Sequence, residues 1–283
     1  MTEELDAQVT AETGAPAPPF AHETSPVIAT APDFARREFA LRERMDGPCT
    51  YADYRAAALS LGQLNRWTRA YRPAQAFLAR VLKHTGVSHE PLHIVDVGCG
   101  HGDGLRAIYR WAARRSVPLR LTGIDSNPYA VRLARECDRI EHVSAGTISW
   151  LTQDIFETQL DRPADVAISS LLAHHLSDHD IARLLHWKET TARVGWLLSD
   201  LRRSERAAQV FTWMSRLLPM NETIAHDGIV SFRRALSLQE WQQLAGAATV
   251  TDAGMGRLVI EHQRFTTPSP QVTTAPPQNS PHI

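Results

Sequence analysis

Several features are scarce in this chain of 283 residues, and each scarcity argues against a class of protein to which the chain could belong. Lysine occurs only at Lys83 and Lys188, and 30 basic residues face 31 acidic ones, so the formal net charge is −1. Such a balance lacks the basic field on which nucleic-acid binding usually depends, and we expect no nucleic-acid partner. The three cysteines, Cys49, Cys99 and Cys137, do not have the spacing of a metal or redox motif, so we expect no metal site.

Long apolar runs and early basic residues are also missing. No apolar stretch approaches the ~18 residues that a membrane-spanning helix needs. A secretory or mitochondrial signal requires early positive charge, and no lysine or arginine precedes Arg36. We therefore expect a cytoplasmic protein without a membrane span.

Composition divides the chain into four parts. Residues 1–32 and 266–283 are rich in Ala, Pro and Thr and have few clustered apolar residues, so we expect both tails to be disordered. Residues 33–87 have helical periodicity and predict an N-terminal helical cap, whereas residues 88–265 carry the main domain. The apolar positions of three expected cap helices are Phe34, Phe39, Leu41 and Met45, then Tyr54, Ala58, Leu61 and Leu64, then Phe77, Leu78, Val81 and Leu82.

The most informative segment is 94–104, which reads Ile-Val-Asp-Val-Gly-Cys-Gly-His-Gly-Asp-Gly. An expected strand, 92–97, runs into a loop with glycine at every second position, and a helical pattern follows. Such a loop marks a ligand-binding turn at the carboxyl edge of a sheet. The third glycine comes one residue too early for the dinucleotide fingerprint. Asp96 would also repel a pyrophosphate, whereas a cofactor with an amino group and a sulfonium tolerates an acid there.

Further strand-like runs follow in order, and the first two of them end in an acid. Residues 119–125 predict a second strand ending at Asp125, and residues 149–154 a third ending at Asp154. Two more strands are expected at 165–170 and 193–200. Short strands near 248–251 and 257–265 complete the pattern, after a helix that opens with the capping box from Ser237 to Glu240.

The pattern Asp-x-Gly-x-Gly-x-Gly, followed by strand-end acids, resembles the class I S-adenosylmethionine-dependent methyltransferases over residues 90–265. The resemblance implies an α/β fold with a Rossmann-like seven-stranded sheet, mostly parallel and closed by a C-terminal antiparallel hairpin. It implies S-adenosylmethionine as cofactor, with the ribose hydroxyls on Asp125 and the adenine amino group on Asp154. The implied cofactor-binding residues are Asp96, Gly98, Cys99, Gly100, Gly102, Asp125, Ser126, Asp154, Ile155 and Ser170.

Three histidines are candidates for catalysis. His174 and His175 follow the fourth strand, where the resemblance implies that acceptor and methyl group meet, and a histidine suits general base work near neutral pH. His226, in a His-Asp-Gly run that reads as a turn, is the third candidate. The alternative for the His174–His175 pair is a structural role, such as orienting a loop or capping the helix that opens at Ser177.

A weaker resemblance to bacterial quinone and polyketide methylases favours a small aromatic, phenolic, quinone or polyketide-like acceptor, with O-methylation preferred over C-methylation. We expect an apolar, largely aromatic acceptor pocket between the cap and residues 210–220, and a monomer or homodimer. The residues expected to form it are Tyr51, Tyr54, Trp67, Tyr71, Phe211, Trp213 and Met214. Methylation of a protein or RNA remains an alternative, as does a non-catalytic partner subunit that binds the cofactor, which a blocked cleft above Gly98 would favour.

Overall fold

The computed structural model describes residues 34–86, 90–144 and 146–264, and the two expected tails lie outside the described residues. One seven-stranded sheet runs through this part of the chain in the order β3-β2-β1-β4-β5-β7-β6. The first five strands are parallel, and β7 is antiparallel to both β5 and β6. This is the sheet that the sequence predicted. The strands are β1 (Leu92–Val97), β2 (Leu119–Asp125), β3 (Ile148–Thr152), β4 (Ala164–Ser170), β5 (Ala192–Leu201), β6 (Thr249–Gly254) and β7 (Arg257–Gln263).

Helices cover both faces of the sheet, so most residues of its central strands β1, β4 and β5 are buried. On one face α3 (Arg72–Thr85), α4 (Asp103–Ala113) and α5 (Pro128–Ile140) pack in one apolar cluster with β1, β2 and β3. On the other face α6 (Asp178–Thr191) and α9 (Leu238–Leu244) pack in a second cluster. Local signals set several of these helix ends: Asn127 caps α5, Ser177 caps α6, and the Ser237–Glu240 capping box opens α9.

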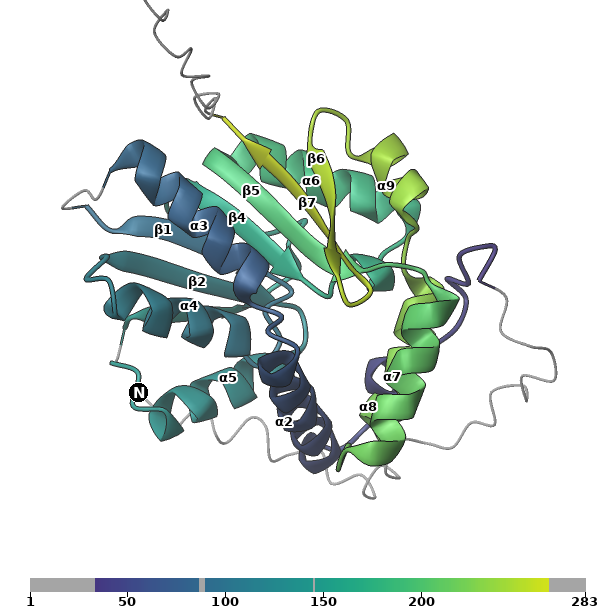
Figure 1. The fold of residues 1–283 in the computed structure, drawn as a ribbon. Helices are drawn as coiled ribbons and strands as arrows, with labels where there is room; N and C mark the ends of the chain where they lie inside the picture. The colour runs from purple at the N-terminus through teal and green to yellow at the C-terminus, as the bar shows by residue number, and fades with distance from the viewer. Residues whose placement is uncertain (1–33, 87–89, 145, 265–283) are drawn as a thin grey trace, which may run out of the picture.

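Three further helices lie beyond the carboxyl edge of the sheet. Figure 1 shows α2 (Tyr51–Trp67) on one side and the pair α7 (Glu205–Leu217) and α8 (Glu222–Arg234) on the other. None of the helices in the described part of the chain has the length and apolar character that crossing a membrane requires. These three helices are the walls of the site described below.

Two expectations about local structure are wrong. Residues 34–43 contain no helix, and only a single 3₁₀ turn, η1 (Arg44–Asp46), follows them. The reason is that this N-terminal strap, residues 34–46, is held in place by hydrogen bonds to distant segments. The N–H of Glu38 donates to the carbonyl of Arg233, and the Arg37 side chain donates to the carbonyls of Arg234 and Leu176.

The expected turn at 226–228 is instead the middle of α8. Asp-Gly is a turn signal in isolation, but here both residues have tertiary roles within a helix. The Asp227 carboxylate accepts hydrogen bonds from the N–H groups of Arg44 and Met45. Gly228 lets α8 approach α7, because a Cβ atom there would lie 2.2 Å from Phe211. Tertiary packing therefore overrides the local preference.

Candidate active site

A cavity of about 730 Å³ lies at the carboxyl edge of the sheet. Its floor is the loop after β1 and the ends of β2 and β4, and its walls are the strap, α2, α7 and α8. Eight of the residues that the sequence singled out line it: Gly98, Cys99, Gly100, Asp125, Ser126, Ser170, His174 and His175. Nothing lies within 4 Å of a Cβ position on Gly100, whereas a Cβ on Gly98 would lie 2.7 Å from the Leu172 side chain. A cavity of this volume over the loop is not the blocked cleft that would have favoured a non-catalytic subunit.

The glycines of the loop serve different purposes. Gly100 has a φ of +55° and nothing within 4 Å of where a Cβ would be, so its backbone faces open space. Gly102 has a φ of +80°, and a Cβ there would lie 2.2 Å from the Trp150 ring. Gly102 does not line the cavity. A glycine is needed at this position so that the start of α4 can pack on the sheet.

Asp125 holds two backbone segments together at the cavity floor. One carboxylate oxygen accepts the N–H of Gly100 at 2.8 Å, and the other accepts the N–H of Asn127 at 2.9 Å. A carboxylate oxygen has two lone pairs, so each can still accept a hydroxyl from a ligand. The geometry thus suits a ribose diol.

Asp96 lies beneath the cavity rather than in it. Its side chain is buried, and one of its oxygens has no hydrogen-bond partner. Burial raises the pKa of Asp96 to about 7, although the charge of Lys188 works in the opposite direction. Lys188 is itself fully buried and donates to the carbonyl of Leu197. These two residues form a buried electrostatic pair under the loop.

Three other residues from the sequence-based set also lie outside the cavity lining. Asp154 comes two residues after β3 ends, is exposed, and accepts the N–H of Phe156. Ile155 packs at the edge of one core cluster. His226 pairs with Asp227 at 2.8 Å on α8. His226 therefore does not line the cavity that His174 and His175 line.

A polar group near α2 was missed by sequence reasoning. Asp103 accepts hydrogen bonds from Asn65 at 3.0 Å and from the Tyr71 hydroxyl at 2.5 Å. Burial opposes ionisation, but the His101 charge and these two hydrogen bonds hold the pKa of Asp103 below its usual value. Asp103 and Asn65 both line the cavity, so an anionic carboxylate faces the space above the loop.

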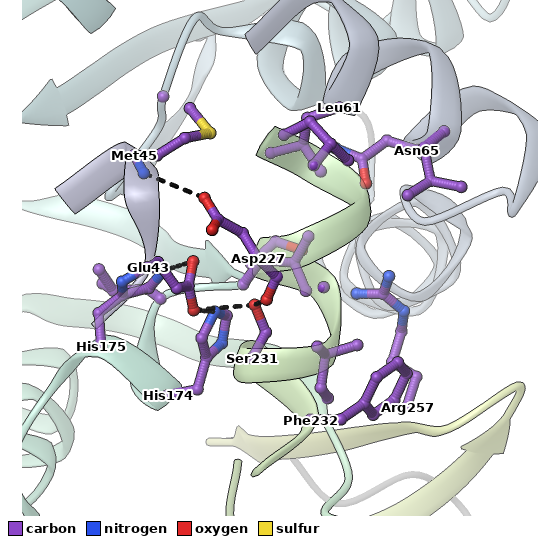
Figure 2. A pocket seen from close by; sticks show the side chains of 18 of the residues that line it. Glu43, Met45, Leu61, Asn65, His174, His175, Asp227, Ser231, Phe232 and Arg257 are labelled. Carbon is purple, nitrogen blue, oxygen red and sulfur yellow. Dashed lines mark hydrogen bonds and ion pairs between the residues drawn. The ribbon is translucent and has the colours of Figure 1, made fainter. Parts of the chain in front are cut away.

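The most concentrated polar group is a cluster of Glu43, His174 and His175 (Figure 2). His174 is buried, and its Nδ1 lies 2.6 Å from the Asp200 carboxylate. His175 is partly exposed, and its Nδ1 lies 3.2 Å from Asp46. Each Nε2 faces a different oxygen of Glu43 at 3.7 Å.

Glu43 is the centre of this cluster, and burial raises its pKa to about 7. The Ser231 hydroxyl donates to it at 2.8 Å. The position of Glu43 had no signal in the sequence, because the strap was expected to be a helix and its partner Ser231 lies 188 residues away. The burial of a carboxylate between two imidazoles follows only from the tertiary fold.

The same three side chains offer ligand atoms that all lie within 4.8 Å of one another. A His₂Glu set of this kind can hold a divalent cation, which the sequence did not lead us to expect. The cluster does not require one, however, because its atoms pair with each other and with Ser231, Asp46 and Asp200.

The walls of the cavity are more aliphatic than expected. Tyr54, Phe211 and Met214 line it, as predicted, but Tyr51, Trp67, Tyr71 and Trp213 do not. Trp67 and Trp213 are 47% and 66% exposed, because they sit on the outer faces of α2 and α7. The helical spacing of the apolar residues predicted the two helices, but it did not predict which face of each helix is turned toward the cavity. Other apolar lining residues include Met45, Leu61, Leu64, Val210, Ile224, Phe232 and Met255.

Comparison with known proteins agrees with this geometry. Residues 94–192 match a family described as "Methyltransferase domain". No curated protein sequence matches the chain. This match, and a sheet order that agrees with the fold that the sequence pattern implied, support the resemblance to class I methyltransferases over this part of the chain.

Two solved structures share the fold. The plantazolicin methyltransferase BpumL, in complex with a triazolic desmethylPZN analog and SAH, is 16% identical; the match covers 75% of this chain and 95% of that chain, with a TM-score of 0.54. Human N-acetylserotonin methyltransferase in complex with SAM is 14% identical; the match covers 77% of this chain and 57% of that chain, with a TM-score of 0.52. At such identities the likeness shows the fold.

Proposed function

We propose that this protein transfers the methyl group of S-adenosylmethionine to a small-molecule acceptor. The observation that carries the proposal is that one cavity joins the glycine loop, Asp125 and the His174–His175 pair. A volume of about 730 Å³ is in the range of small-molecule sites. A walled cavity favours a small acceptor over a protein or an RNA.

The cofactor fits the floor of this cavity. Asp125 has free lone pairs for the ribose hydroxyls, and Gly100 leaves room for close approach. The Asp103 carboxylate is the group on this floor that suits the α-amino end of the cofactor. Asp154 and Ile155 remain our candidates for the adenine. The two related structures are crystallised with SAH and with SAM, which supports the same cofactor here.

The chemistry requires alignment first, because the sulfonium is already a good leaving group. An acceptor oxygen held about 3–3.5 Å from the methyl carbon attacks it, the carbon–sulfur bond breaks, and the sulfur becomes a thioether. A hydroxyl acceptor must also lose its proton. We assign that proton to Nε2 of His175, because Asp46 holds the opposite ring nitrogen and the side chain is partly exposed. His174 is enclosed and held by Asp200, which suits a positioning role.

The lining supports an acceptor with a largely apolar body, such as a phenol, a quinone or a polyketide-like ring. O-methylation is our preferred reaction, since a general base at the cavity wall serves a hydroxyl most directly. The acceptor class and the reacting atom are part of the proposal.

Calorimetry tests the cofactor half of this proposal. Wild-type protein should bind S-adenosylmethionine and its demethylated product, and Asp125→Ala should weaken both by roughly 1–3 kcal/mol because two ribose hydroxyls lose their acceptor. His186→Ala, on the exposed face of α6, is the matched control and should not change affinity. Equal affinity in wild type and Asp125→Ala would remove the assignment of the cavity floor.

A further inference from the structure

Arg257, at the start of β7 and partly buried, has one guanidinium nitrogen without a protein partner. Its Nη1 atom is buried and has no hydrogen-bond partner. A guanidinium carries five N–H donors, and leaving them unpaired away from water is unfavourable. Burial also lowers the pKa of Arg257, and the charges of Asp200 and Tyr71 only partly offset this effect. Such a group requires an explanation that the fold itself does not supply.

Asp200 is the carboxylate whose charge acts most on Arg257, and its hydrogen bonds are to other groups. Both oxygens of Asp200 accept hydrogen bonds, one from the backbone N–H of His174 and one from its imidazole. The N–H of Leu201 also donates to Asp200. By contrast, the neighbouring Arg203 has a full set of protein acceptors in Phe34, Ala235 and Glu240.

The guanidinium lies in the acceptor half of the cavity. Arg257 pairs with Leu201 at the end of β5 and lines the cavity. Its strand is three positions from β1 in the sheet, a span of roughly 14 Å at ~4.8 Å per strand. Figure 2 shows the side chain pointing toward Leu61 and Asn65, on the opposite side of the cavity from His175. The lining around it is largely apolar, from Leu61 and Leu64 on α2 and Phe211 and Met214 on α7.

We propose that the methyl acceptor carries a carboxylate that binds to Arg257, while its apolar body lies between α2 and α7 and its reacting atom faces His175. The planar fork of a guanidinium matches a carboxylate in two parallel hydrogen bonds. One anionic anchor at the far end of an apolar chamber fixes the orientation of the acceptor, and so the distance of its nucleophile from the methyl group. This inference rests on the proposed methyl transfer and names the substrate class of that site.

Binding of a matched pair of probes tests the proposal. The probes are 2-naphthoate and its neutral analogue 2-naphthamide, titrated by calorimetry into protein saturated with S-adenosylhomocysteine. Wild type should bind the acid at least tenfold more tightly than the amide, and Arg257→Met should abolish this preference. Arg206→Met, at an exposed arginine that also lines the cavity, is the control and should retain it. Equal binding of both probes to wild type, or no binding of the acid at millimolar concentration, overturns the proposal.

Two further measurements separate the proposal from other roles for Arg257. The affinity for S-adenosylhomocysteine should stay within threefold in Arg257→Met. A loss of more than tenfold in that affinity would indicate that the guanidinium binds the carboxylate of the cofactor instead. If wild type fails to bind S-adenosylhomocysteine at all, the proposed function fails first, and that outcome is distinct from a lost acid preference in a protein that binds it.

Thermal unfolding provides the last measurement. A buried guanidinium nitrogen without a partner is kept for a ligand at some loss of stability, so Arg257→Met should raise the Tm of the ligand-free protein by about 2–4 °C. A fall of several degrees would show that Arg257 supports the fold, and the acceptor role would then be withdrawn.

Discussion

The two adjacent histidines differ in what surrounds them, and this difference predicts which one carries the proton. Only 3% of the His174 side chain is exposed, whereas 29% of the His175 side chain is exposed. We expect His175→Ala to lower the methyl-transfer rate roughly 10²–10⁴-fold, with cofactor affinity unchanged. His226→Ala should retain the wild-type rate, because that residue does not line the cavity. The measurement is single-turnover transfer with labelled cofactor, and full activity of His175→Ala would leave alignment alone as the mechanism.

Glu43 predicts a pH dependence of stability. Its folded pKa of about 7 lies above the ordinary value of 4.5. At a pH between these two pKa values, the folded state therefore holds a proton that the unfolded state has lost. The free energy of unfolding should therefore fall as pH rises through that window, by up to roughly 3 kcal/mol. Glu43→Gln keeps an acceptor for Ser231 but cannot ionise, so its stability should depend less on pH.

Urea denaturation of wild type and Glu43→Gln at pH 5 and pH 8 measures this difference. The relevant quantity is the change in unfolding free energy between the two pH values, compared across the two proteins. Parallel pH profiles would mean that Glu43 is ionised in the folded protein throughout, balanced by protonated imidazoles.

At the scale of single elements, the contact between α7 and α8 depends on one glycine. In an open helix, Gly→Ala stabilises by up to about 1 kcal/mol. At Gly228 the added Cβ would lie 2.2 Å from the Phe211 ring, so we expect Gly228→Ala to destabilise by about 1–3 kcal/mol and to distort the cavity wall.

Gly104 in α4 provides the matched control. A Cβ there would meet its nearest neighbour, Asp96, at an ordinary 3.6 Å. Gly104→Ala should therefore stabilise the protein by about 0.5–1 kcal/mol. Opposite signs for the two substitutions in urea denaturation would confirm the packing argument, and equal stabilisation would contradict it.

Elements whose signals are local could be predicted from the sequence, and elements set by tertiary contacts could not. Strands β1 and β2 end where the sequence predicted, since apolar runs and the flanking glycines and acids mark them. The helix α5 follows from Asn127 and Pro128 in the same way. The strap and α8 were missed because their partners, such as Arg37 with Leu176 and Asp227 with Met45, are more than 130 residues apart.

The same distinction between local signals and tertiary contacts applies to the residues of the site. The glycine loop and Asp125 are contiguous motifs, and the sequence located them. Glu43, Asp103 and Arg257 were not located, because a single buried acid or arginine has no pattern of its own. The role of each of these residues depends on the distant segments that pack against it in the folded protein.

At the scale of the whole molecule, we expect ligand binding to stabilise the contacts between the segments that line the cavity. The cavity is lined by the loop after β1 on one side and by α2 and α8 on others. Saturating S-adenosylhomocysteine, at about 100 times its Kd, should stabilise the fold by about 2.7 kcal/mol. Amide hydrogen exchange should slow in residues 98–103 and 125–127, whereas exposed β6 serves as the internal control. Uniform protection over the whole sheet, without a local maximum at the loop, would contradict the proposed cofactor position.

The separation of the two halves of the cavity has a consequence for how such a protein diversifies. The cofactor floor comes mainly from one short stretch, 98–127, which lies within the matched domain, 94–192. The acceptor walls come from residues 43–68, 201–214, 224–232 and 255–257, all outside that stretch. Many mutations in the walls need not disturb the floor, although Asn65 on α2 donates a hydrogen bond to Asp103. A lineage built on this plan can exchange one acceptor for another while its methyl donor stays the same.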